Sequence, residues 1–291
     1  MTESRDSVPA VILDFDGSVS LDGASVIPLR EREEEIRFAC SKRSLRSLAA
    51  SLAPFIHSLT PVVFLGSGDF HHVTLPLIER MGERGRMIQV VVFDNHPDNM
   101  RFPFGIHCGS WVWHVSRLPF VSRVHVAGIT SSDVERGHIW ENHLDVLRSG
   151  KVVYWCVERD LSALAGAGAL QSRSFPTMLA LLEALGQAVA ATSEPVYLSI
   201  DKDVLAHDVV QTNWDQGVMR LEELESAIGM MRGRIIGSDV VGDVSLYRYR
   251  HWFRRLLSGL DHQPAIPPQA LPLWQANHRE VNRRLLTLLT R

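Results

Sequence analysis

Uninterrupted apolar, β-branched runs are the feature that most restricts the fold of this 291-residue chain. Residues 89–93 read Gln-Val-Val-Val-Phe, without the alternation of apolar and polar side chains that marks a strand with one face in water. Strands of this kind are buried on both faces, as in a parallel sheet that helices cover on each side. The run therefore predicts an α/β protein.

Similar short runs recur along the chain, with amphipathic segments between them. The predicted strands are residues 8–13, 61–65, 88–93, 121–127, 152–157, 196–200 and 234–238. The predicted helices are residues 31–52, 71–84, 177–191, 221–231, 250–260 and 277–289. Strands that alternate with helices indicate a largely parallel sheet with helices on both faces. We expect the Pro-rich segment 263–272 to cross the surface, and we predict a single domain over residues 1–291.

Composition argues against several classes of protein. The formal net charge is −3 and there is no Lys/Arg-rich run, so a nucleic-acid partner is not expected. The longest apolar runs have the length of strands, so no membrane span is expected. The three cysteines are far apart, which fits a reducing compartment better than a disulfide framework. Residues 1–7 lack the apolar core of a signal peptide, and the protein is predicted to be cytoplasmic.

Acidic and histidine residues follow three of the predicted strands. Residues 94–98 read Asp-Asn-His-Pro-Asp, residues 199–203 read Ser-Ile-Asp-Lys-Asp, and residues 66–72 read Gly-Ser-Gly-Asp-Phe-His-His. In open α/β sheets the ligand site lies beyond the carboxyl ends of the strands. We therefore expect the three segments to meet in one pocket.

Carboxylates and imidazoles gathered in this way are typical of a metal site. A single Asp after a strand is most simply a helix cap or a turn residue, but capping gives no reason for a histidine between two carboxylates. Four carboxylates in one pocket would repel one another unless divalent cations were present. The candidate ligands are His71, Asp94, His96, Asp98, Asp201 and Asp203. They exceed what one tetrahedral ion needs and predict two divalent metals, with Mn²⁺ favoured and Fe, Co, Ni or Zn as alternatives.

Two adjacent metals predict a hydrolytic reaction. They would polarise a bridging water to hydroxide near neutral pH, and this nucleophile can attack a planar carbon such as that of an amide, amidine or guanidine. His107 lies on the loop after residues 94–98 and could protonate the leaving nitrogen. A turn histidine bonded to the backbone is an equal alternative. Asp98 and His107 are the two candidate catalytic residues.

The motifs resemble those of the ureohydrolase superfamily, which includes arginase, agmatinase and formimidoylglutamase. The resemblance spans residues 61–243, and the family's G-G-D-H-like, D-A-H-x-D and S-x-D-x-D motifs have counterparts here in the same order. It implies a three-layer α/β/α sandwich with a mostly parallel sheet. It also implies hydrolysis of linear C–N bonds in a small guanidino, amidino or formimino compound. Oligomeric state varies in the family, so a homo-oligomer is left open.

The same resemblance implies a role for each ligand. One metal would use His71, Asp94, Asp98 and Asp201, and the other would use Asp94, His96, Asp201 and Asp203. Either His71 or His72 could fill the histidine position of the first motif, and the spacing to Asp94 favours His71. The family glutamate that grips the guanidinium has no clear match, since a glycine takes its place with Asp243 beside it. Asp243, Asn99 and Trp214 are the candidate substrate contacts.

Three other functions are open at this point. A single-zinc deacetylase would share the fold but would need neither His71 nor Asp98. A relative without catalytic activity would leave the complete ligand set unexplained. Residues 14–18 read Asp-Phe-Asp-Gly-Ser, like the start of a haloacid-dehalogenase-type phosphatase, but that function would leave the other acidic motifs without a role.

Overall fold

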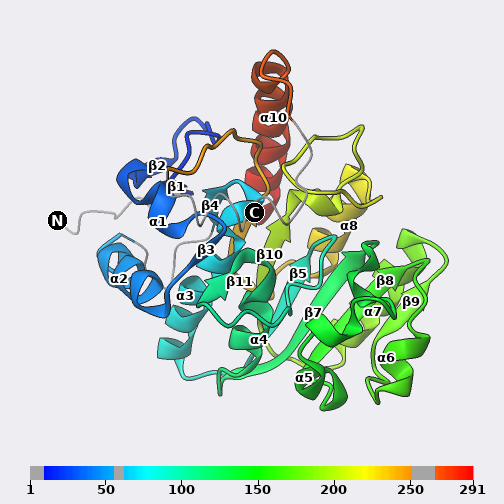
Figure 1. The fold of residues 1–291 in the computed structure, drawn as a ribbon. Helices are drawn as coiled ribbons and strands as arrows, with labels where there is room; N and C mark the ends of the chain where they lie inside the picture. The colour runs from blue at the N-terminus through cyan, green and yellow to red at the C-terminus, as the bar shows by residue number, and fades with distance from the viewer. Residues whose placement is uncertain (1–9, 56–61, 251–265, 291) are drawn as a thin grey trace.

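The computed structural model describes residues 10–55, 62–250 and 266–290. Within these residues the centre of the molecule is a nine-stranded sheet of order β2-β1-β4-β11-β10-β5-β7-β8-β9, in which every pairing is parallel (Figure 1). Its strands are β1 (Val11–Asp14), β2 (Ser25–Pro28), β4 (Val62–Gly66), β5 (Ile88–Phe93), β7 (Val121–Ile129), β8 (Val152–Val157), β9 (Arg173–Phe175), β10 (Val196–Asp201) and β11 (Ile235–Val241). A short antiparallel pair joins β3 (Ala39–Cys40) to β6 (Ile106–His107).

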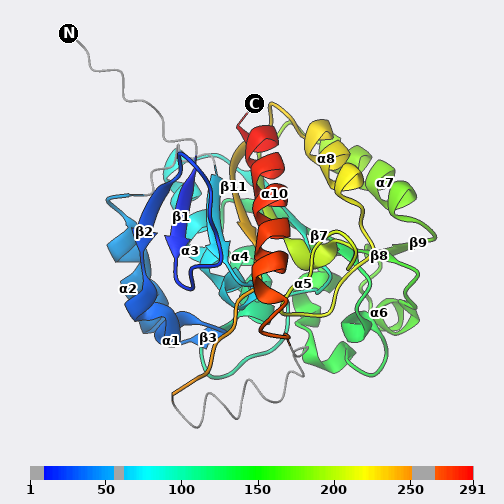
Figure 2. The ribbon, with the colours of Figure 1, turned by 90° about the horizontal axis from the view of Figure 1, so that it is seen from above.

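Helices cover both faces of the sheet. One core contains side chains of α2 (Lys42–Leu52), α3 (Thr74–Glu79), α4 (Trp111–Ser116), α5 (Leu144–Arg148) and α6 (Ser162–Gly166). The other contains side chains of α7 (Met178–Ala190), α8 (Leu221–Met230) and α10 (Leu271–Leu289), as Figures 1 and 2 show. In β5, Val90 and Val92 enter the first core, whereas Val91 and Phe93 enter the second. This two-sided burial explains the continuous apolar run and confirms the three-layer α/β/α sandwich.

All seven predicted strands are present, but the sequence did not indicate the edges of the sheet. Residues 8, 9 and 61 of the predictions lie outside the described residues. The edge strands β2 and β9 were missed because both are short and mostly exposed, so neither contains an apolar run. The two-residue strands β3 and β6 were missed for the same reason of length.

The helix predicted at 31–52 is wrong, because the chain turns in its middle. A 3-10 turn at Arg30–Arg32 leads into α1 (Glu33–Ile36), and α2 starts only at Lys42. Phe38 between them has a left-handed backbone with φ of 70°. Its N–H donates to the Asp69 carbonyl at 2.8 Å, and its carbonyl accepts from Cys108 N–H at 2.9 Å. The backbone of Phe38 therefore bonds to two loops of the site instead of continuing a helix.

Other helix boundaries also differ from the prediction. The segment predicted as a helix over 71–84 is α3 flanked by 3-10 turns at Gly68–Val73 and Arg80–Arg84. The last helix begins at Leu271 and not at 277, with a proline in its first turn, where the missing N–H costs no hydrogen bond. It therefore includes the end of the segment expected to cross the surface at 263–272. The helix predicted at 250–260 falls outside the described residues, except for its first residue.

The four central strands set the position of the site. β4, β11, β10 and β5 are neighbours in that order, and all run in the same direction. The segments that follow β4, β5 and β10 contain the three acidic and histidine motifs, so these motifs emerge at one edge of the sheet. Among the helices that the structure describes, none has the length and apolar character needed to cross a membrane.

Candidate metal centre

The three motifs converge at the carboxyl edge of the sheet. His71 lies in the 3-10 turn Gly68–Val73 that follows β4, and Asp94, His96 and Asp98 lie on the loop that follows β5. Asp201 is the last residue of β10, and Asp203 lies in the next turn.

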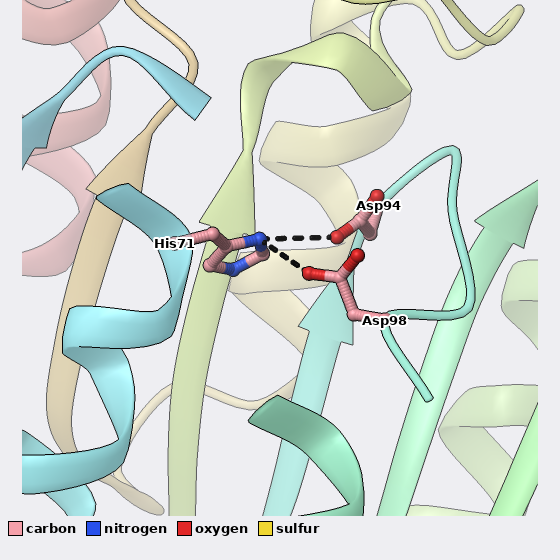
Figure 3. A group of neighbouring side chains, drawn as sticks. All are labelled: His71, Asp94 and Asp98. Carbon is pink, nitrogen blue, oxygen red and sulfur yellow. Dashed lines mark ion pairs between the residues drawn. The ribbon is translucent and has the colours of Figure 1, made fainter. Parts of the chain in front are cut away.

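His71 faces three of the carboxylates. Its Nδ1 lies 2.9 Å from Asp98 Oδ2, 3.2 Å from Asp94 Oδ2 and 3.4 Å from Asp201 Oδ2. Figure 3 shows the imidazole pointing from its turn toward Asp94 and Asp98 on the loop opposite. All of these side chains are buried.

His96 forms a second group with the same central carboxylate. Its Nδ1 lies 2.9 Å from Asp203 Oδ2 and 3.6 Å from Asp94 Oδ1. In each of the two groups, His71–Asp94–Asp98 and Asp94–His96–Asp203, the possible ligand atoms lie within 4.8 Å of one another. Asp94 thus turns Oδ2 toward one histidine and Oδ1 toward the other, as a carboxylate shared by two neighbouring sites would.

Contacts outside the two groups hold the ligands in place. His71 Nε2 lies 2.9 Å from Ser199 Oγ, and the Ser199 hydroxyl donates to Asp239 Oδ1 at 2.9 Å. Trp111 Nε1 donates to Asp98 Oδ2 at 2.6 Å. These partners leave Nδ1 of His71 directed at the carboxylates, and they hold Asp98 Oδ2, the oxygen that faces it.

The electrostatics of the protein without metal show why the acids need a counter-charge. Burial raises the pKa of Asp98 to about 7, and the charge of Asp94 adds to the rise. Burial and Asp94 likewise raise the pKa of Asp203 to about 7, and burial with Asp203 raises the pKa of Asp201. Burial disfavours the charged form of Asp94 as well, but the facing imidazoles of His71 and His96 outweigh it and lower its pKa. Divalent cations would relieve this mutual repulsion.

The donor set fits two divalent cations. Four carboxylates and two imidazoles, with no thiolate among them, suit Mn²⁺ and related ions. Asp94 Oδ2 is buried and accepts no hydrogen bond from the residues that the structure describes. A buried carboxylate oxygen without such a partner is costly, and a cation would satisfy it.

A cavity of about 220 Å³ opens over these groups. Its wall includes five of the six predicted ligands, Asp94, His96, Asp98, Asp201 and Asp203, together with the predicted His107 and Trp214. It also includes Asp133, Glu141 and Asp215, none of which is among the predicted site residues.

Other predicted site residues lie elsewhere. His72 is fully buried and belongs to neither group of possible ligands, whereas His71 belongs to the group with Asp94 and Asp98. Asn99 is also fully buried and donates to the Tyr154 hydroxyl at 2.8 Å, away from the cavity wall. Asp16, from the segment that resembles a phosphatase, forms a buried ion pair with Arg37 at 3.1 Å.

Asp243 does not reach the cavity, because another residue binds it. Its Oδ2 lies 2.6 Å from Lys202 Nζ, and both side chains are buried. The preceding Gly242 has φ of +88°, and a Cβ there would collide with Asp201 Oδ1. Neither position therefore presents a carboxylate to a substrate, so Asp243 is not placed as the sequence suggested.

Several residues that shape the site were missed. Trp111 is buried like a core residue, but its N–H also binds Asp98. Asp239 and Asp215 were not predicted as site residues. Asp239 supports His71 through Ser199, and Asp215 contacts His96 directly. The only signal in the sequence was that buried tryptophan and aspartate need hydrogen-bond partners, which does not name the partner.

Comparison with known proteins agrees with this arrangement. The family model described as the arginase family matches residues 17–243. An uncharacterized protein from Thermotoga maritima is 31% identical over 195 residues, which are 65% of this chain and 62% of that protein. The chain thus spans less than two thirds of the length of this relative.

Solved structures show the same fold at low sequence identity. Proclavaminate amidino hydrolase from Streptomyces clavuligerus is 18% identical with a TM-score of 0.51, and the match covers 85% of this chain and 69% of that one. Arginase from Medicago truncatula is 16% identical with a TM-score of 0.52, covering 90% and 71%. Formiminoglutamase from Trypanosoma cruzi, solved with Mn²⁺, is 13% identical with a TM-score of 0.52, covering 92% and 74%.

The family match includes the segments after β4, β5 and β10 and therefore every ligand of the two groups. By the extent of this match, the chain belongs to the arginase family.

Proposed function

We propose that the protein is a binuclear metal-dependent hydrolase of linear C–N bonds in a guanidino, amidino or formimino compound. The observation that carries the proposal is the position of Asp94 between His71 and His96, with one carboxylate oxygen toward each. Membership of the arginase family supports hydrolysis of this kind of bond. A single-metal deacetylase site would have no use for the contact between His71 and Asp98.

Two sets of residues would hold the metals. His71, Asp94, Asp98 and Asp201 would bind one ion, and Asp94, His96, Asp201 and Asp203 would bind the other. When bound, paired divalent cations, with Mn²⁺ favoured, would supply activation of water and polarisation of the substrate. Asp98 is proposed as catalytic because a carboxylate within this group can also accept a proton from water.

His107 is the proposed proton donor. It lines the cavity, and its Nδ1 accepts from Gly109 N–H at 2.9 Å. In the neutral ring, the tautomer that accepts this bond carries its proton on Nε2. The His107 ring packs at nearly a right angle to the ring of Phe38, with 4.3 Å between ring centroids. A ring held in this way could deliver its Nε2 proton to the leaving nitrogen.

The charge of the cavity wall supports a cationic substrate. Beyond the ligands it includes Asp133, Glu141 and Asp215, and no lysine or arginine among the described residues lines it. Two divalent ions would only balance the four ligand carboxylates, so the wall would stay negative. This favours a substrate with an amine or guanidinium at its far end over one with a carboxylate there.

The test is turnover of the Mn²⁺-loaded protein with a panel of guanidino, amidino and formimino compounds, following urea, ammonia and formamide. We expect turnover of at least one cationic compound. We also expect His107→Asn to lower kcat by about 10²–10⁴-fold with its metal content unchanged. If the protein binds two metals and turns over no compound of the panel, the proposed reaction is wrong.

We also propose a cytoplasmic location and a small-molecule partner. Among the described residues, no disulfide joins the three cysteines, all of which are buried, and this supports a reducing compartment. The expected absence of nucleic-acid and membrane partners is still a prediction. A homo-oligomer is likewise left open.

A further inference from the structure

The loop at residues 212–217 places one carboxylate behind a candidate metal ligand. Asp215 Oδ1 lies 2.8 Å from His96 Nε2, on the opposite side of the ring from Asp94 and Asp203. Asn95 donates from Nδ2 to both the carbonyl and Oδ2 of Asp215, each at 3.2 Å. The Asp215 carboxylate is thus held on one oxygen by the loop that carries His96 and faces the imidazole with the other.

The loop itself is fixed from several sides. Thr212 Oγ1 donates to the Trp214 carbonyl at 3.0 Å, and Gln216 Nε2 donates to the carbonyls of Leu205 and Val210 at 3.0 Å each. Gly217 N–H donates to the Asp203 carbonyl at 2.7 Å. These bonds tie the loop to the backbone of a predicted ligand, so the position of Asp215 is set by the fold and not by its own side chain alone.

The two histidines have unlike partners. His71 Nε2 faces the hydroxyl of Ser199, which is buried and bonded in turn to Asp239. His96 Nε2 faces the carboxylate of Asp215, whose side chain is 67% exposed. A buried hydroxyl thus supports one ring and a solvent-exposed charge supports the other.

We propose that Asp215 is the positioning residue of His96 and that only one of the two metal positions depends on it. This inference rests on the proposed function. By accepting a hydrogen bond from Nε2–H, Asp215 fixes the tautomer in which the Nδ1 lone pair points to Asp94 and Asp203, and it makes Nδ1 a stronger donor to a metal ion. Loss of the carboxylate leaves the ring free to turn and should weaken metal binding at the His96 position by about 10–100-fold. The His71 position keeps its own partners.

The experiment is a Mn²⁺ titration of metal-free protein, read by electron paramagnetic resonance and by metal content. The variants are Asp215→Ala, Asp215→Asn and Asp215→Glu, and the matched control is Asp208→Ala. Asp208 precedes the same loop and has a 65% exposed side chain, but it pairs with Arg220 and does not line the cavity. Melting of each metal-free variant checks that the fold is kept.

We expect the wild-type protein and Asp208→Ala to bind two ions and to show the spectrum of a coupled pair. Asp215→Ala should bind its first ion as wild type does and its second about 10–100-fold more weakly, with a single-ion spectrum at concentrations that saturate wild type. The affinity of Asp215→Asn for the second ion should lie between those of wild type and Asp215→Ala, because the amide oxygen accepts a hydrogen bond without the charge. Asp215→Glu keeps the charge and should recover part of the affinity that Asp215→Ala loses.

Two results would overturn the inference and leave the proposed function standing. One is an Asp215→Ala protein that binds both ions as tightly as Asp208→Ala does. The other is equal weakening of both ions, which would indicate a general structural role for Asp215. A wild-type protein that binds fewer than two ions would instead remove the proposed function, and this inference with it.

Discussion

Asp98 shows how a single ligand residue is held in an unfavourable conformation. Its φ is 46°, in the left-handed region that few residues other than glycine adopt. Its carbonyl accepts from Val112 N–H at 3.0 Å, and its Oδ2 accepts from Trp111 Nε1 at 2.6 Å. Such conformations persist where the surroundings determine them more than once, and they gather at functional sites.

Replacing Trp111 tests this support at the scale of one hydrogen bond. Trp111→Phe keeps most of the buried ring but removes the N–H that binds Asp98, so Mn²⁺ affinity should fall about 10–100-fold, the range seen for partners of metal ligands. Trp113→Phe, in the same helix, is the control, since Trp113 Nε1 makes no hydrogen bond within the described residues. Equal Mn²⁺ affinity of the two variants in a titration would show that Trp111 acts only by packing.

At the scale of elements, a buried polar cluster joins the last helix to the sheet. Lys202, between two predicted ligands after β10, pairs with Asp243 after β11 and donates to Asn282 Oδ1 of α10 at 2.7 Å. Asn282 Nδ2 in turn donates to Asp243 Oδ1 at 2.9 Å. Lys202 therefore points away from the ligands, and its ammonium links α10 to the ends of the two strands.

Breaking this buried pair should be costly. Lys202→Met leaves the Asp243 carboxylate buried without its cation, and we expect the free energy of unfolding to fall by about 3–5 kcal/mol. Arg220→Met is the control, because its pair with Asp208 is exposed and should contribute about 0–1 kcal/mol. Urea unfolding with a chelator present measures both variants without any contribution from metal.

If Lys202→Met costs no more than Arg220→Met, the cluster does not stabilise the fold. The double variant Lys202→Met/Asp243→Asn should recover part of the loss, since it no longer buries an unpaired charge.

The sequence predicted an element correctly where neighbouring residues determine it, and failed where residues remote in the sequence do. The strand β5 could be predicted because its burial on both faces is written in five consecutive residues. The break of the helix predicted at 31–52 could not, because Phe38 bonds to Asp69 and Cys108, which are remote in the sequence. A hydrophobic pattern does not record such distant backbone partners.

At the scale of the whole molecule, the order of the strands decides what the site contains. The motifs could be placed at strand ends from the sequence, because parallel strands end at one edge. That β10 lies between β5 and β11 was not evident, and this order determines which residues meet Asp94. It also decides that Asp215 reaches His96 while Asp243 is bound by Lys202 and withdrawn from the cavity. The contacts of the loop at residues 212–217 and of the buried Lys202–Asp243 pair depend on this strand order. A single sequence does not reveal the strand order.

The central claim is that the converging ligands hold two cations through the shared carboxylate of Asp94. The most direct measurement is the metal content per chain of protein loaded with Mn²⁺ and then freed of excess ion by gel filtration. Two ions per chain in the wild-type protein is the predicted result, with loss of both in Asp94→Ala. One ion per chain, or binding that survives unchanged in Asp94→Ala, would contradict the claim.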